Sequence, residues 1–229
     1  MSQKAADQRE SETSKTGLEA IVAVLAMAAL QLLVWILSLN NGWAVGGPGA
    51  WVWLFPILPE VLIVAVVATQ GSHLESDQTG RRRAVAVGLT SVVSILNTII
   101  LLRVVFELFA GGKASASELA VAATVVWLTL VVSTAMLYWE LDGGGPERRI
   151  LKPDGQRDFL FSEMTAVKLV PLNWRPSLID YGFLSLTTAI CWSAADVQPI
   201  SRGAKALMAY ETTISALTIL GIVARAANG

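Results

Sequence analysis

The 229-residue chain has few of the side chains on which most enzyme chemistry depends. It contains one cysteine, Cys191, and one histidine, His73. A single cysteine excludes an internal disulfide and a cysteine-based metal cluster, and a single histidine excludes a histidine metal site and removes the usual general base. We therefore expect neither an enzyme nor a bound cofactor. The net charge of −1 gives no indication of nucleic-acid binding.

Charge of either sign is also scarce, and long apolar stretches take its place. Charged residues make up 15% of the chain, against roughly a quarter in soluble domains. Five apolar blocks are long enough to cross a lipid bilayer as helices: Gly17–Leu39, Trp51–Thr69, Ala84–Phe109, Leu119–Leu141 and Ala204–Ala227. A sixth block, Leu178–Ala195, has a helical length of about 27 Å, which only just suffices. The predicted fold is all-α, a polytopic helical membrane protein with five transmembrane helices plus a sixth segment that crosses fully or re-enters.

Polar segments divide the chain into four regions. Residues 1–16 are polar without apolar periodicity, which predicts a disordered cytoplasmic tail. Residues 17–141 hold four transmembrane helices, and residues 178–229 form a carboxyl-terminal helical hairpin. Between them, residues 142–177 form a polar cytoplasmic loop with scattered apolar residues. This loop is either an amphipathic segment on the membrane surface or a solvent-facing loop with its own small fold.

Lysine and arginine residues alternate between the loops in a way that predicts orientation. They precede the first span and follow the second and the fourth, whereas the first loop has none and the third has only Lys113. The pattern places the amino terminus and the loops after the second and fourth spans in the cytoplasm. With six crossings, the preferred number, both termini are cytoplasmic, although Arg202 and Lys205 then lie on the outer side. The tail charges and the lack of a cleavable signal favour a bacterial inner membrane.

Four ionisable residues within the apolar blocks are candidates for functional groups. They are Glu60, Arg103, Glu107 and Glu211. Glu60 lies in the second span directly after Pro59, where a carboxylate costs roughly 3 kcal/mol unless it is paired, protonated or facing water. It is either a proton site or a structural partner of Arg103. Arg103 and Glu107 share one helix face, and an arginine near a helix end extends to the interface.

A glycine-rich turn follows the fourth span. The run Asp142-Gly143-Gly144-Gly145-Pro146-Glu147-Arg148-Arg149 has the glycines and arginines of an anion-binding turn. It lacks the Lys-Ser/Thr pair and the flanking strand of a phosphate loop. We interpret it as a helix terminator followed by cytoplasmic charge.

The last fifty residues carry short motifs in a defined order. These are Thr187-Thr188, Asp196-x-x-Pro199, Ala204-Lys205 and Glu211. The order resembles the pore module of potassium-channel-like pore-loop cation channels over about residues 178–227, and the whole chain resembles an uncharacterised bacterial family of multi-span membrane proteins. The resemblance implies a homo-oligomer in the bilayer, with four subunits if it is channel-like, and a monovalent cation as the permeant ion. The implied pore-lining residues are Thr187, Thr188, Ser193 and Asp196.

The selectivity filter of those channels is missing. Potassium filters coordinate ions with backbone carbonyls, and their glycines permit that backbone conformation. No glycine lies between Thr188 and Asp196. Three functions therefore remain open: a cation channel or leak pathway with a non-standard filter, in which Glu211 braces the inner helix; a non-conducting membrane scaffold or sensor; and a small proton-coupled transporter that uses Glu60.

Overall fold

A computed structural model describes residues 2–43, 49–68, 76–110, 114–152, 155–166, 169, 171, 174–192 and 196–228. The described chain is almost entirely helical, with one pair of three-residue strands, which confirms the all-α prediction. In chain order the elements are α1 (Ser2–Asn41), η1 (Ala50–Leu54), α2 (Ile57–Ala68), α3 (Ser76–Ala110), α4 (Ala116–Leu141), η3 (Asp142–Gly144), α5 (Pro146–Leu151), β1 (Phe159–Phe161), α6 (Ser162–Thr165), α7 (Leu178–Cys191), β2 (Val197–Pro199) and α8 (Arg202–Asn228).

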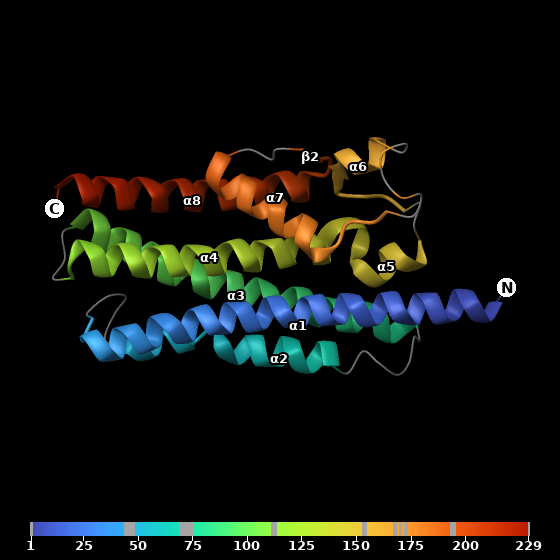
Figure 1. The fold of residues 1–229 in the computed structure, drawn as a ribbon, viewed down its shortest axis with the longest axis horizontal. Coiled ribbons are helices and arrows are strands. Elements are labelled where there is room, and N and C mark those ends of the chain that lie inside the picture. Colours follow the sequence, from blue (N-terminus) through green and yellow to red (C-terminus); the bar gives the residue numbers. More distant parts are fainter. Residues whose placement is uncertain are drawn as a thin grey trace.

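Five helical segments are long and apolar enough to cross a membrane, and they coincide with the five predicted blocks. They are Thr13–Asn41, Ala50–Val67, Arg83–Ala110, Ala116–Leu151 and Arg202–Ala227. They run side by side along the long axis of the molecule, as an integral membrane protein requires (Figure 1). The first helix begins at Ser2, so it includes the polar segment that composition alone predicts to be disordered. An established apolar helix propagates into adjacent Lys, Glu, Gln and Ala at little cost.

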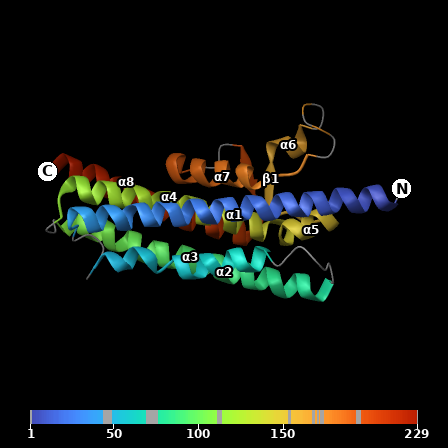
Figure 2. The same ribbon diagram turned by 60° about the horizontal axis from the view of Figure 1, so that its bottom comes forward.

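Helix α4 is the centre of the bundle. It contacts α1, α3, α7 and α8. In the most apolar 18-residue stretch of its span, 67% of the residues are buried, against 28% to 39% in the same stretch of the other four spans. Helix α2 packs against α1 and α3, whereas α7 packs against α4 and α8. Figure 2 shows the consequence, with α2 and α7 on opposite sides of the bundle.

Helix α7 enters the bundle and does not cross it. Its 14 residues extend about 21 Å, well short of the roughly 30 Å apolar core of a bilayer. The helix ends at Trp192, which adopts a left-handed conformation with a φ of 55°. The chain then returns, because β2 pairs antiparallel with β1, with Phe159 opposite Pro199 and Phe161 opposite Val197. Both ends of the re-entrant segment therefore lie at one end of the bundle.

This path corrects the preferred number of crossings. The two ends of the chain lie at opposite ends of the bundle (Figure 1), because five long helices cross it and α7 turns back. Six crossings would place both termini on one side, which does not fit this path. A segment that re-enters without crossing, the alternative prediction, fits it, and its role as a pore helix stays a prediction. The physical reason is that the helix in this block stops after Cys191, so its apolar length is not used to span the bilayer.

The polar loop before α7 has a small fold of its own at that same end. It contains α5, β1 and α6 in the described residues. The aromatic rings of Phe159 and Phe161 are buried and stand edge-on to Tyr181 of α7, with ring centroids 6.4 and 5.1 Å away. Helix α7 starts at a capping box in which the backbone N–H of Ser177 donates to Asp180 at 2.7 Å. This loop thus determines where α7 enters the bundle.

Candidate functional site

A buried carboxyl group lies where the second span is broken. The span is interrupted by a turn at Phe55 and Pro56, which separates η1 from α2, as the two prolines predict. Glu60 follows in the first turn of α2, where the free backbone N–H groups of a helix favour a carboxylate. Its side chain is 1% exposed. Sequence and local structure together therefore place an acidic group inside the membrane-spanning part of the protein.

The partner of Glu60 is Gln31 of α1. The Nε2 atom of Gln31 donates a hydrogen bond of 2.6 Å to the Oε1 atom of Glu60. The predicted pairing with Arg103 is wrong, because Arg103 lies on an exposed part of α3. Glu107, one turn further along α3, is partly buried. Neither residue joins Glu60 in a common site.

Two remaining oxygens of this pair and two nitrogens of neighbouring side chains are buried and lack a partner in the described part of the chain. They are Glu60 Oε2, Gln31 Oε1, Trp53 Nε1 and Asn97 Nδ2. A cavity of about 10 Å³ lies between Gln31, Trp53, Asn97 and Thr129. We call it the small cavity. It has room for about one water molecule, and its unpaired donors and acceptor suit a water. Leaving each group unpaired would cost about 1–3 kcal/mol, so the site favours an occupant that forms hydrogen bonds.

A polar stripe on α3 leads away from the small cavity. Thr90, Ser94 and Asn97 are all buried and are spaced four and three residues apart, which puts them on one helix face. The hydroxyls of Thr90 and Ser94 also lack a partner among the described residues. Ala86, one turn before Thr90, lines a larger pocket of about 340 Å³ at the end of the bundle. The helix rises about 16 Å from Ala86 at the larger pocket to Asn97 at the small cavity, and the polar stripe covers about 10 Å of that distance.

The carboxyl-terminal hairpin contains a second buried carboxyl group. Glu211 of α8 is 0% exposed. Its Oε2 atom accepts a 2.5 Å hydrogen bond from the hydroxyl of Tyr138 in α4, and its Oε1 atom accepts one from the hydroxyl of Ser185 in α7. The Ser185 hydroxyl also lies 2.7 Å from the backbone oxygen of Val131. Glu211 thus joins α4, α7 and α8, and both of its oxygens have partners.

The predicted pore-lining residues do not gather around one cavity in the described structure. The Thr187 hydroxyl donates to the carbonyl of Phe183 in its own helix at 2.9 Å. Thr188 is fully buried, and its hydroxyl has no partner among the described residues. Asp196 is exposed directly before β2. Ser193 lies outside the described residues.

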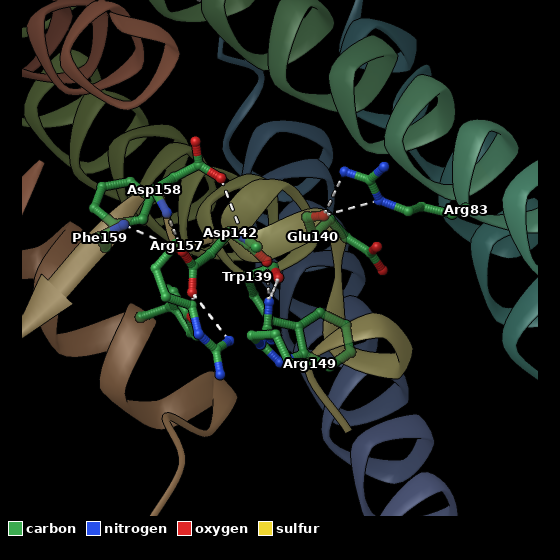
Figure 3. Close-up of polar contacts among 10 residues, drawn as sticks. Arg83, Trp139, Glu140, Asp142, Arg149, Arg157, Asp158 and Phe159 are labelled. Carbon is green, nitrogen blue, oxygen red and sulfur yellow. Dashed lines mark hydrogen bonds and ion pairs between the residues drawn. The ribbon is translucent and has the colours of Figure 1, made fainter. Parts of the chain in front are cut away.

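A third polar cluster is centred on Asp142, at the end of α4 (Figure 3). Asp142 is 0% exposed. Its Oδ1 atom accepts from the backbone N–H groups of Asp158 and Phe159 at 2.7 and 3.1 Å. Its Oδ2 atom accepts from the hydroxyl of Tyr181 at 2.6 Å and lies 3.8 Å from Nη1 of Arg157. The carboxylate therefore connects α4, the strand β1 and α7.

Arg149 completes this cluster from α5. It is 4% exposed, and its Nη1 atom donates to the backbone oxygens of Trp139 and Asp142 at 2.5 and 2.7 Å. Its guanidinium also lies over the ring of Tyr181, 5.3 Å from the centroid. Since both oxygens of Asp142 and the Nη1 atom of Arg149 bind groups within the protein, we assign this cluster a structural role. It anchors the loop from which α7 enters.

Sequence analysis identified both buried carboxyls and missed their partners. Gln31, Tyr138 and Ser185 are ordinary polar interruptions of apolar blocks, and which helix faces another is not a local property of the sequence. The spacing of Thr90, Ser94 and Asn97 on one face was a usable signal for the polar stripe. Among the described residues, no group of three His, Cys, Asp or Glu side chains is placed to hold a metal ion.

Comparison of the chain with protein-family models, with curated proteins and with solved structures finds no match.

Proposed function

We propose that this integral membrane protein moves protons across the bilayer through the bundle of α1, α2, α3 and α4, with Glu60 as the proton-binding group. One observation carries the proposal. Glu60 is a buried intramembrane carboxyl whose second oxygen has no partner in the described part of the chain. It is bonded to Gln31, which lines the small cavity together with Asn97 of the polar stripe. An ionisable side chain at this depth is expensive and is a mark of ion or proton pathways.

The size of the small cavity favours a proton over a larger solute. A volume of about 10 Å³ admits one water molecule and no organic substrate. A proton passes between carboxyl, amide-bound water and hydroxyl groups without needing a wide pore. The break between η1 and α2 supports the same conclusion, because interrupted helices at membrane depth line binding sites in transport proteins.

The distribution of basic residues supports an orientation with the amino terminus in the cytoplasm. In this orientation the larger pocket, which Arg83, Arg148 and Lys152 help to line, faces the cytoplasm. Five crossings then leave the carboxyl terminus outside. Arg202 and Lys205 return to the cytoplasmic side, which removes the exception that six crossings create. A bacterial inner membrane suits this arrangement.

The test is proton flux into liposomes that contain the purified protein and a trapped pH-sensitive dye, driven by a potassium diffusion potential. We expect flux from the wild-type protein and its loss in Glu60→Gln, which keeps the hydrogen-bonding shape and removes the titratable group. Glu211→Gln is the matched control, since it changes a buried carboxyl outside the proposed pathway and should retain flux. Equal flux from wild type and Glu60→Gln, with both proteins shown to be folded, would refute the proposal.

A second candidate is an oligomeric cation channel built around α7. The observation in its favour is the re-entrant path of α7 followed by the full-length α8, which is the order of a pore loop and an inner helix. Asp196→Asn should then alter potassium or sodium flux while Glu60→Gln leaves it unchanged. Silence for protons and both cations from folded protein would favour a non-conducting scaffold or sensor.

A further inference from the structure

The larger pocket, which we call the interfacial pocket, lies at the end of the bundle where α4 passes into α5. Its volume is about 340 Å³, far more than a water molecule needs. It is formed where the first turns of the α1 and α3 spans meet the last turn of α4 and helix α5, with Thr16, Ala86 and Trp139 among its lining residues. Its location coincides with an end of the apolar spans, and therefore with the membrane interface.

Three basic side chains from two directions line this pocket. Arg83 comes from α3, and Arg148 and Lys152 come from α5 and the residue after it. Arg83 reaches the end of α4, where its Nε and Nη2 atoms donate to the backbone oxygen of Glu140 at 3.4 and 3.3 Å (Figure 3). Arg148 and Lys152 are exposed, in contrast to the buried neighbour Arg149.

The turn at Gly144 and Gly145 leaves space for the side chains of Arg148 and Arg83 to lie against the backbone. Gly144 and Gly145 have φ angles of 88° and 98°, which side chains with a Cβ rarely adopt. A Cβ on Gly144 would lie 2.5 Å from Cδ of Arg148, and a Cβ on Gly145 would lie 3.1 Å from Nε of Arg83. The turn therefore forms one wall of the pocket and holds both guanidinium groups beside it.

The charge of the pocket matches a singly charged anion. Glu140 and Glu147 also line it, so three basic and two acidic side chains leave a surplus of one positive charge. A phosphodiester carries one negative charge, and arginine guanidinium groups bind phosphate oxygens well. The remaining wall is apolar, with Val67, Leu151 and Trp139 among its residues. A charged rim above an apolar wall at the membrane interface has the chemistry of a phospholipid with its glycerol region.

We propose that the interfacial pocket binds the headgroup of an anionic phospholipid from the leaflet at that end of the bundle. The phosphate lies among Arg83, Arg148 and Lys152, and the glycerol and first methylene groups lie against Trp139 and Leu151. Lipid binding at this pocket does not depend on proton movement through the bundle.

The experiment is native mass spectrometry of the full-length protein in mild detergent, titrated with phosphatidylglycerol or with phosphatidylcholine of the same acyl chains. We expect at least one tightly bound phosphatidylglycerol and weaker binding of phosphatidylcholine. The double variant Arg148→Gln/Lys152→Gln should lower the affinity for phosphatidylglycerol roughly 25-fold, about fivefold for each basic residue. Both side chains are exposed, so the fold does not depend on them.

The matched control is Arg202→Gln/Lys205→Gln at the start of α8, where both side chains are exposed at the same end of the bundle. It should retain the wild-type affinity. An equal loss in both double variants would overturn the proposal, because general surface charge would then explain the binding. Displacement of phosphatidylglycerol by excess inorganic phosphate would also overturn it, since the pocket would then be a site for a free anion.

Discussion

Replacing Tyr138 by phenylalanine removes one atom from the contact that joins the three helices of the carboxyl-terminal half. The Tyr138 ring packs edge-on against Phe159 with centroids 5.0 Å apart, and a phenylalanine ring keeps this contact. Only the hydroxyl that donates to Oε2 of Glu211 is lost. Ser185→Ala removes the donor to Oε1 in the same way. The pair of variants therefore measures how strongly Glu211 holds α7 and α4 to α8.

The expected magnitudes follow from the burial of Glu211. Hydrogen bonds between membrane helices contribute about 0.6 kcal/mol on average and up to about 1.7 kcal/mol. Because Glu211 is 0% exposed, we place Tyr138→Phe at about 1–2 kcal/mol and Ser185→Ala at about 1 kcal/mol. Together they leave a buried carboxyl without either donor, so the double variant should lose about 1 kcal/mol more than the sum.

A third substitution tests the reasoning directly. In the double variant, Glu211→Leu removes the unpaired carboxyl and should recover about 2 kcal/mol. The assay is reversible unfolding in mixed micelles by titration with sodium dodecyl sulfate, followed by far-ultraviolet circular dichroism. Additive losses in the double variant, or no recovery with Glu211→Leu, would show that Glu211 does not depend on these two donors.

Two further predictions concern the turn and the topology. Gly144→Ala should destabilise the protein by about 1–2 kcal/mol because of its positive φ. Gly182→Ala, where a Cβ meets nothing within 4 Å, should instead stabilise α7 by up to about 1 kcal/mol. Thermal unfolding compares the two variants, and equal effects would show that the positive φ of Gly144 causes no strain in alanine. In a Cys191→Ala background, Asp196→Cys and Ser117→Cys should react with a membrane-impermeant maleimide from opposite sides of sealed vesicles. Labelling from the same side would mean that α7 crosses the bilayer.

The five long spans were predictable because apolar length is a local property that each block displays by itself. The segment Leu178–Ala195 was ambiguous for the same reason, since its length suits a short crossing or a re-entrant helix. Which of these two paths the chain takes depends on the left-handed conformation of Trp192 and on pairing between two three-residue strands. Strands this short leave no periodic pattern in the sequence. Composition therefore predicts the number of apolar blocks but not the path of the one between α4 and α8.

The candidate sites were predictable to a similar extent. A carboxyl inside an apolar block is conspicuous, and the structure buries both Glu60 and Glu211. Their partners depend on helix neighbours that hydropathy does not specify. Arg103 has the right charge to pair with Glu60, but it is exposed on α3. The neutral Gln31 makes the hydrogen bond to Glu60 instead. Charge complementarity was thus a poor guide where the packing of helices decides which side chains meet.

The pairing of β1 with β2 has a consequence for biosynthesis. It keeps both ends of the α7 segment on the side where the ribosome delivers the loop after α4, in the proposed orientation. The insertion machinery then has to transfer only the apolar α7 into the bilayer. Asp196, Arg202 and Lys205 never pass through it, so no charged turn between α7 and α8 has to be translocated. In this orientation the insertion step that a fully crossing hairpin would require is absent, and α8 alone would carry the chain to the far side.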